Sequence, residues 1–247
     1  MWGLGMSAAE PLPTPPAPSA LEAGDLIWPK KPGAIVPYDS RPGSAAQDTA
    51  DRWNREKNVY LDQLKAKSHL SEEERSRYEL LHSMTYDAFK VQYFGASAPG
   101  EAATYGTGGF YTGHVGIIRI LDGTPYVVEA MMGKGVRQLS YKDWIHERSG
   151  EIFWVGRLKQ ITADRRAAIA ETAAREIGQP YNFWNFDLAD RREYYCSKLA
   201  WISILSVTGF APDDNKNPKR VLWYSPKQLM NSRHIDIKIN PGPYLSR

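Results

Sequence analysis

Short apolar segments rich in β-branched and aromatic residues recur along the chain, and each predicts a strand. They are Gly24 to Pro29, His114 to Ile120, Pro125 to Ala130, Ile152 to Leu158 and His234 to Ile239. Asp122-Gly123 separates the second segment from the third, and this dipeptide is a strong signal for a hairpin turn. The segment GVRQLS, which follows the hairpin, is a candidate for one more strand of the same sheet.

Apolar residues at helical spacing predict helices between these strands. One helix is expected from Gln47 to Lys67. A second begins at Ser71, where Ser71 and Glu74 make a capping box, and its apolar positions continue to Tyr93. Further helices are expected after Ser140, after Thr162, from Cys196 to Val207 and at Ser225-Pro226. The helical pair, within about 46–94, is predicted to be an insertion, and residues 95–113 are predicted to form a long loop.

This mixture predicts an α+β fold, with an antiparallel sheet or half-barrel packed on helices. Residues 21–247 are expected to form a single domain after a disordered tail, residues 1–20, which is rich in Pro, Ala and Ser. The tail has two interpretations. It is either the end of a removed signal peptide with a flexible tether, which predicts a periplasmic or secreted protein, or a plain linker in a cytoplasmic one.

Composition narrows the function classes. The chain has 247 residues, 42% of them hydrophobic, and a net charge of +3, which is ordinary for a globular protein. A Lys/Arg run is absent from the sequence, so nucleic acid is not an expected partner. An apolar stretch of about 20 residues is also absent, so no transmembrane segment is predicted. The five histidines and one cysteine show no metal-ligand spacing, and no phosphate-binding glycine loop occurs, so no metal or cofactor is predicted. The oligomeric state is not indicated.

Cys196 is the single cysteine, which excludes an intramolecular disulfide. It stands at the junction between an aromatic run and a long apolar helix. A helix N-terminus presents unpaired N–H groups and partial positive charge, which favour a thiolate and can also face an oxyanion. Cys196 is therefore a candidate nucleophile, and a buried, inert thiol is the alternative.

His114 opens an apolar strand after a glycine-rich segment, so it is the candidate base for this thiol. With Asp122-Gly123 as a two-residue turn, Gly116 pairs with Glu129, and His114 and Glu129 become diagonal neighbours on one face of the hairpin. A four-residue turn would place them opposite each other, and a one-residue slip would separate them. Glu129 is the polar residue of an otherwise apolar strand, so a partner such as the imidazole is expected for its carboxylate. An exposed edge glutamate is the alternative.

These motifs resemble the permuted papain-like amidases, the YaeF/YiiX-like branch of the NlpC superfamily. The resemblance is carried by GDLIW, GHVGII, VVEA, QPYNFWNF and YYCSKLAW, which occur in the family's order from Gly24 to Trp201. It implies a circularly permuted papain-like fold, with Cys196 as nucleophile, His114 as general base and acid, and Glu129 orienting the imidazole. It also implies that Tyr195 or Tyr194 lines the oxyanion side, and that Asp25 is structural or faces the substrate. Lys198 and Asn182 depart from the acidic residues of the family pattern.

The expected activity is that of a cysteine amidase or peptidase acting on a cell-wall peptide or a related amide through an acyl-enzyme. Three alternatives stay open. The same three residues fit a lipid acyltransferase or thioesterase, or a secreted antibacterial effector that degrades a rival's cell wall. The third alternative is a binding protein without catalysis, in which Cys196 reacts like an ordinary thiol.

Overall fold

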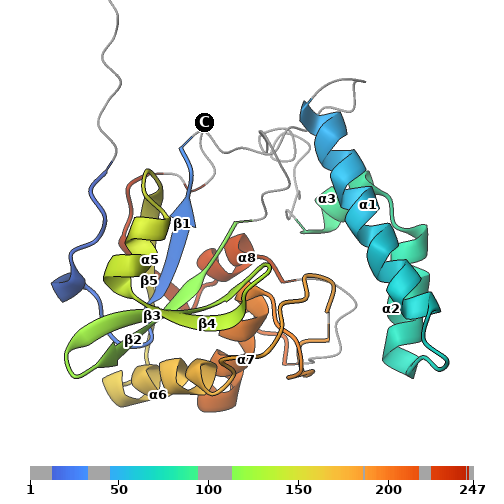
Figure 1. The fold of residues 1–247 in the computed structure, drawn as a ribbon. Coiled ribbons are helices and arrows are strands. Elements are labelled where there is room, and N and C mark those ends of the chain that lie inside the picture. Colours follow the sequence, from blue (N-terminus) through green and yellow to red (C-terminus); the bar gives the residue numbers. More distant parts are fainter. Residues whose placement is uncertain are drawn as a thin grey trace, which may run out of the picture.

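The structure is a computed structural model that describes residues 13–32, 45–93, 113–185, 187–216, 224–242 and 244. Six antiparallel strands form one open sheet in the order β4-β3-β2-β1-β5-β6 (Figure 1). The strands are β1 (Leu26–Lys30), β2 (Gly116–Leu121), β3 (Thr124–Met131), β4 (Gly135–Ser140), β5 (Ile152–Leu158) and β6 (Ile235–Ile239). The predicted α+β class and the antiparallel sheet are confirmed.

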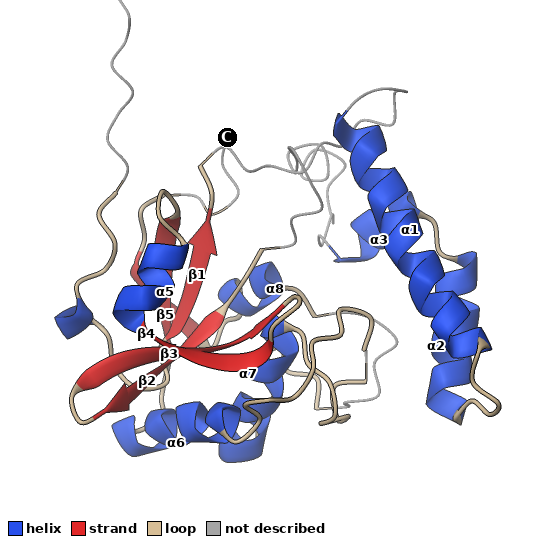
Figure 2. Ribbon diagram, in the orientation of Figure 1, coloured by secondary structure: helices blue, strands red, loops and turns tan. Residues whose placement is uncertain are grey.

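Helices cover the sheet from two sides and also form a separate group beside it (Figure 2). The helices are α1 (Ala45–Lys65), α2 (Glu72–Ser83), α3 (Tyr86–Tyr93), α5 (Tyr141–Glu147), α6 (Ala163–Ala174), α7 (Cys196–Thr208) and α8 (Pro226–Met230), with a short 3-10 turn at Pro18–Ala20. Helices α1, α2 and α3 lie between β1 and β2 in the sequence and stand to one side of the sheet. Helix α5 packs on one face, and α6 and α7 pack on the other.

The central strand β1 contributes to a hydrophobic core on each face. Ile27 belongs to the smaller core, which contains Trp144 of α5. Leu26 and Trp28 belong to the larger core, which contains Trp201 of α7. All five residues of β1 are buried, as expected for a strand covered on both sides.

The β2–β3 hairpin has the two-residue turn that the sequence predicts. Leu121 pairs with Thr124, and Asp122 and Gly123 both have positive φ values, 48° and 76°. Two positive φ values are the mark of the tight turn that matches the twist of a hairpin. The register continues to a pair between Ile117 and Val128. It therefore brings the residues that precede β2 close to the end of β3.

The second predicted helix is two helices in the structure, which corrects the prediction of a continuous helix to Tyr93. Helix α2 begins at the predicted capping box of Ser71 and Glu74 and ends at Ser83. Met84 has extended backbone angles, and the Thr85 hydroxyl accepts a hydrogen bond from the Ala88 N–H to start α3. A second N-terminal cap inside the apolar pattern ends one helix and starts the next.

An aromatic cluster attaches α1 and α3 to the segment that precedes Cys196. The ring centroid of Trp184 lies 5.9 Å from that of Trp53 in α1 and 6.3 Å from that of Phe89 in α3. Phe183 and Trp184 contact each other edge to face at 4.8 Å. Such aromatic pairs add to the free energy gained by burying their area. The sequence QPYNFWNF thus supplies rings on which α1 and α3 pack.

Part of the predicted disordered tail is ordered. Pro16 is buried, and its carbonyl accepts a hydrogen bond of 2.8 Å from the Tyr141 hydroxyl at the start of α5. Leu21 enters the smaller core, so it anchors this segment from its other end. Residues 1–12 of the predicted tail and residues 95–112 of the predicted loop lie outside the described residues.

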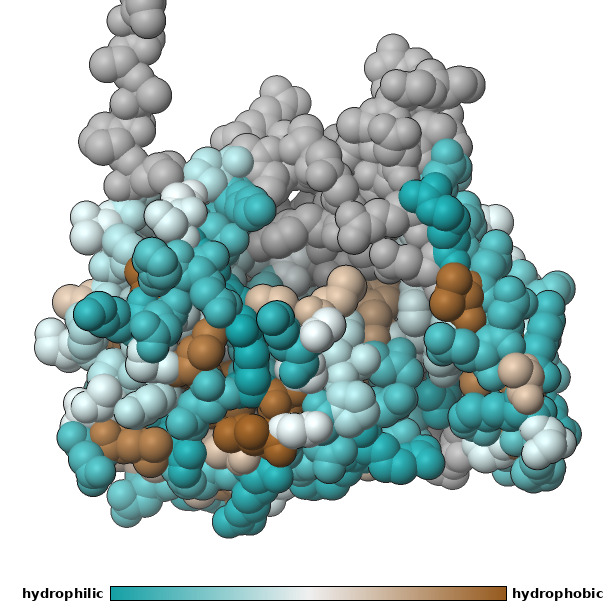
Figure 3. Space-filling view, in the orientation of Figure 1, coloured by the Kyte–Doolittle hydropathy of each residue, from teal (hydrophilic) through white to brown (hydrophobic). Residues whose placement is uncertain are grey.

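The face of the molecule shown in Figure 3 is mostly hydrophilic, and its apolar side chains form separate patches. Among the helices that the structure describes, none combines the length and the apolar character needed to cross a membrane.

Replacement of Trp184 tests the aromatic attachment. Trp184→Ala removes a buried ring that contacts both α1 and α3, so it should lower the free energy of unfolding by about 3 to 5 kcal/mol. Val59→Ala, at an exposed position of α1, should change it by less than about 0.5 kcal/mol. Denaturant unfolding of both variants gives the comparison. Equal losses of unfolding free energy in the two variants would contradict the role of Trp184 in attaching α1 and α3.

Candidate active site

Cys196 is the first residue of α7, and its side chain is buried. The residue before it, Tyr195, has extended backbone angles and makes no side-chain cap, and the first turn of α7 contains no acidic residue. The N–H groups of this turn are therefore not neutralised by a neighbouring carboxylate on the helix. Their partial positive charge lies beside Cys196, where it can stabilise negative charge that develops during a reaction.

His114 lies just before β2, where a glycine sets its direction. Gly113 has a φ of 82°, and a Cβ atom at this position would lie 2.7 Å from the Tyr244 hydroxyl oxygen. A larger residue would be strained in the backbone and would clash with Tyr244. This explains in physical terms why a glycine precedes the histidine in the GHVGII motif.

The structure brings His114 together with both Glu129 and Cys196. Nε2 of His114 lies 2.7 Å from Oε2 of Glu129. Burial opposes protonation of the imidazole, but the charge of Glu129, together with the charge of Cys196 and its hydrogen bond to the ring, raises the pKa of His114 to about 9. Because Glu129 occupies Nε2, Nδ1 is the ring nitrogen that is left available to the thiol. The predicted contact between His114 and Glu129 is present.

Glu129 is fully buried at the centre of a group of hydrogen-bond donors. Oε2 accepts hydrogen bonds from His114, from Nε1 of Trp144 and from Nη2 of Arg148, each at 2.7 Å. Oε1 accepts two from Arg137, at 2.7 and 3.0 Å. Burial alone would raise the pKa of this carboxyl. The positive charge and hydrogen bond of His114, followed by the charge of Arg148 and the indole of Trp144, instead hold its pKa far below the usual range.

Trp144, Arg137 and Arg148 are site residues that the sequence interpretation missed. Arg137 had a detectable signal, because it is the cross-strand partner of Glu129 in the β3–β4 hairpin. Trp144 and Arg148 come from α5 and its C-terminal cap, so only the packing of α5 on the sheet brings them to the carboxylate. The guanidinium of Arg148 also lies over the Trp144 ring, 4.2 Å from its centroid.

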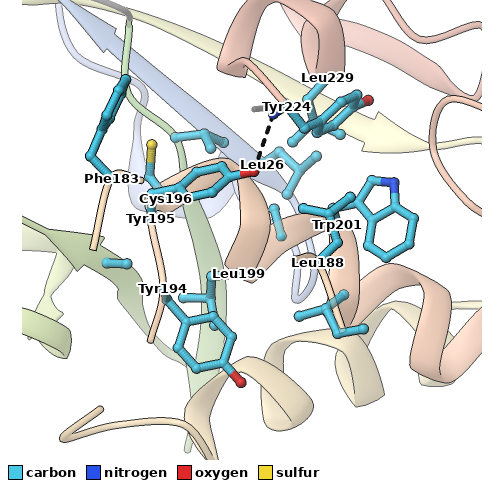
Figure 4. Packing of buried hydrophobic residues seen from close by; sticks show 14 of the residues in the cluster. Leu26, Phe183, Leu188, Tyr194, Tyr195, Cys196, Leu199, Trp201, Tyr224 and Leu229 are labelled. Atoms are coloured by element: carbon cyan, nitrogen blue, oxygen red, sulfur yellow. Dashed lines mark hydrogen bonds between the residues drawn. The ribbon is translucent and has the colours of Figure 1, made fainter. Parts of the chain in front are cut away.

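The hydroxyls of Tyr194 and Tyr195 lie away from the Cys196 sulfur, and the predicted place of these residues on the oxyanion side stays a prediction. Both side chains are fully buried. The Tyr195 hydroxyl accepts a hydrogen bond of 3.1 Å from the Tyr224 N–H, and in Figure 4 the Tyr194 ring points away from the sulfur of Cys196. Alternation along the extended segment before α7 directs the two side chains into different parts of the core.

Asp25 lies in a buried ion pair at the entry of β1, and its predicted role, structural or facing the substrate, stays a prediction. Its carboxylate is buried and receives a bidentate ion pair from Arg157, at 2.7 and 2.9 Å, and a hydrogen bond of 2.8 Å from the Glu22 N–H. These contacts tie the entry of β1 to β5.

The segment before Cys196 is held by backbone pairing. Asn182 donates its N–H to the Tyr194 carbonyl, and Tyr194 donates its N–H to the Pro180 carbonyl, both at 3.0 Å. The Asn182 side chain bonds to the Trp184 N–H and to Glu193. This pairing places Phe183 next to the start of α7. In Figure 4, Phe183 and the sulfur of Cys196 point in the same direction, opposite to Tyr194.

An open groove of about 400 Å³ begins at this segment. Its apolar lining comes from Tyr181, Phe183, Trp184, Val59 and Met132, and Arg55 contributes a charge. A groove of this size suits part of a small or chain-like ligand. Within the described ranges, no group of three or more His, Cys, Asp or Glu side chains could hold a metal ion.

Replacement of Arg148 tests how much the buried carboxylate depends on its cations. Arg148→Met keeps an apolar contact with Trp144 but removes the positive charge that Arg148 places beside the Glu129 carboxylate. It should therefore lower the free energy of unfolding by about 3 to 5 kcal/mol. Arg119→Met removes a similar ion pair with Glu171, which is half exposed, and should cost about 1 kcal/mol or less. Urea denaturation at neutral pH measures both. Equal losses would show that Arg148 is not essential to the buried carboxylate.

The chain is similar to two proteins from Escherichia coli. YiiX of Escherichia coli (strain K12), an uncharacterized protein, is 30% identical over 116 residues, which are 46% of this chain and 55% of YiiX. The chain thus aligns with about half the length of this relative. The crystal structure of the metalloprotein YiiX from Escherichia coli O157:H7 matches with a TM-score of 0.48 and 15% identity, over 90% of this chain and 98% of that one.

A family model matches a longer part of the chain than the alignment with YiiX of strain K12 does. The family is described as permuted papain-like amidase enzymes, YaeF/YiiX, C92 family, and its model matches residues 77–228. This range is more than half of the chain and includes His114, Glu129 and Cys196. The chain belongs to the permuted papain-like amidase family.

Proposed function

We propose that this protein is a cysteine amidase that cleaves an amide bond through an acyl-enzyme on Cys196. The observation that carries the proposal is the continuous series of contacts from Glu129 to His114 to Cys196 at the N-terminus of α7. The membership of an amidase family supports it. A nucleophile, a base and a group that orients the base are the three parts that such catalysis needs.

The first step forms the acyl-enzyme. The Cys196 thiolate attacks the carbonyl carbon of the amide, and the negative charge moves to the carbonyl oxygen. The N–H groups at the start of α7 stabilise this oxyanion. The imidazolium of His114 then donates its Nδ1 proton to the amide nitrogen, and the C–N bond breaks to release an amine. Glu129, on Nε2, holds the ring in place and stabilises its positive charge.

The second step releases the product. Neutral His114 removes a proton from a water molecule, and the resulting hydroxide attacks the thioester carbonyl. The C–S bond breaks, the carboxylic acid leaves, and the thiolate and imidazolium are restored. The imidazole keeps 14% of its side-chain surface exposed whereas the Glu129 carboxylate keeps none, so a water molecule can reach the histidine but not the carboxylate.

A cell-wall peptide or a related amide is the proposed substrate, and the proposed place of action is the periplasm or the exterior of the cell. A second candidate uses the same residues on a lipid acyl group, as an acyltransferase or thioesterase. The apolar groove next to Phe183 favours it, because rings and methionine suit an acyl chain. The adduct on Cys196 separates the two, since a peptide adduct supports the first and an adduct with a fatty chain supports the second.

Variants of the two central residues test the amidase. Cys196→Ala should abolish the release of fragments from purified peptidoglycan, because no thioester can form. His114→Ala should lower the rate by about 10²- to 10⁴-fold through loss of acid–base catalysis. His234→Ala is the matched control, since this histidine contacts Asp214 and not Glu129, and should retain activity. Chromatography of the released fragments measures all three. Undiminished digestion by Cys196→Ala would refute the proposal.

The pH dependence tests the raised pKa of His114. As the pH rises through about 9, the imidazolium loses the proton that the leaving amine needs, so kcat/KM should fall above this pH. Glu129→Gln removes the negative charge that raises the pKa of His114, so the fall in kcat/KM should begin at lower pH. Rate profiles from pH 6 to 11 on folded protein measure both. A Glu129→Gln profile that coincides with the wild-type profile would contradict this role of Glu129.

A further inference from the structure

A second cavity, of about 360 Å³, lies between the α1–α2 hairpin and the segment from Pro180 to Glu193. It adjoins the apolar groove, because both are lined by Tyr60, Gln63, Asn182 and Glu193. The two differ in chemistry. The groove is mainly apolar, whereas the lining of this cavity includes three cationic and three carboxylate side chains.

Four of these six charges are already paired. Nζ of Lys67 lies 2.6 Å from the carboxylate of Glu74, which also closes the capping box of α2. The guanidinium of Arg192 lies 2.9 Å from Asp190. Within each pair the two charges compensate each other, so these four side chains offer little charge to a ligand.

Arg77 and Glu193 are different. Arg77 is 7% exposed, and its guanidinium makes a single long hydrogen bond, 3.4 Å, to the neutral hydroxyl of Tyr60. Glu193 accepts hydrogen bonds from the amide side chains of Asn182 and Asn185, at 2.7 and 3.3 Å. Neither has an oppositely charged group within ion-pair distance in the part of the chain that the structure describes. A buried guanidinium is normally paired with an anion because its desolvation is costly.

We propose that this cavity binds a zwitterionic ligand, with the ligand carboxylate on Arg77 and its ammonium group on Glu193. The guanidinium offers the parallel N–H donors that a carboxylate accepts in pairs, and Glu193 offers acceptor oxygens to an ammonium. Among the described lining residues the three positive and three negative charges balance, so the unpaired Arg77 and Glu193 call for one ligand charge of each sign. An amino acid or short peptide carries one charge of each sign and matches the two unpaired groups. The site goes beyond the chemistry proposed for Cys196.

Calorimetry on the full-length Cys196→Ala protein tests the site, because this variant binds ligands without turning them over. Alanine and alanyl-alanine are the probes, and at least one should bind saturably. For the probe that binds, the C-terminal amide lacks the carboxylate and the N-acetyl form lacks the ammonium. Each capped form should bind about tenfold more weakly or worse, as expected when a charged hydrogen bond is lost.

Two substitutions then assign the charges, both made in the Cys196→Ala background. Arg77→Met should weaken binding of the free probe at least about tenfold and should remove the difference between the free and amidated forms. Glu193→Gln should remove the difference between the free and acetylated forms. Arg192→Met is the matched control, because this cation lines the same cavity but is paired with Asp190, and it should change affinity less than about twofold. Thermal unfolding checks that each variant is folded.

The source of the ligand follows from one more titration. A cell-wall peptide that binds much more tightly than alanyl-alanine would show that the cavity holds the charged end of a substrate reaching along the groove. Equal affinity for the cell-wall peptide and for alanyl-alanine would show that the cavity is a separate site for small amino acids or peptides. Either result supports the site. Absence of binding by both probes, or equal losses in Arg77→Met and Arg192→Met, would overturn it. Neither overturning result affects the Cys196 chemistry, which is measured by fragment release.

Discussion

The candidate site depends on one buried negative charge, the Glu129 carboxylate. A buried charge is tolerated only when it is paired and its lone pairs are satisfied. Here two arginines, an indole and an imidazole supply the donors, and they come from three parts of the chain: β4, α5 with its C-terminal cap, and the segment before β2. The same contacts that make the carboxylate tolerable therefore hold β3, β4, α5 and the residue before β2 in one arrangement.

This arrangement also explains the electrostatics of His114. The ring is largely removed from water, and burial by itself favours the neutral imidazole. An ionised Glu129 on one nitrogen and Cys196 on the other side reverse that preference. His114 itself and then Arg148 hold the pKa of Glu129 low, so Arg148 acts on the histidine through the carboxylate that they share. A charge balance of this kind favours the imidazolium form of His114 at neutral pH.

The segment from Pro180 to Tyr195 connects the site with the helices beside the sheet. Its backbone pairs with itself and so fixes Tyr194, two residues before Cys196. Its rings, Phe183 and Trp184, bury Trp53 and Phe89 of the helical group. Its polar residues line the charged cavity. One short segment thus sets the start of α7, attaches α1–α3 and contributes walls to both the groove and the cavity.

The sequence by itself determined the features that arise from local pattern. Alternation and turn chemistry gave the strands and the Asp122-Gly123 hairpin, capping residues gave the helix starts, and the hairpin register placed His114 and Glu129 on one face. The tertiary structure alone decided which distant groups surround them. Trp144 and Arg148 reach Glu129 through the packing of α5. The two tyrosines before Cys196 turn into the core. Arg77 faces a cavity in which no carboxylate of the described residues forms an ion pair with it. Local sequence patterns constrain the backbone conformation and the face on which a side chain lies. The partners of a buried charge depend instead on which helices and strands pack together.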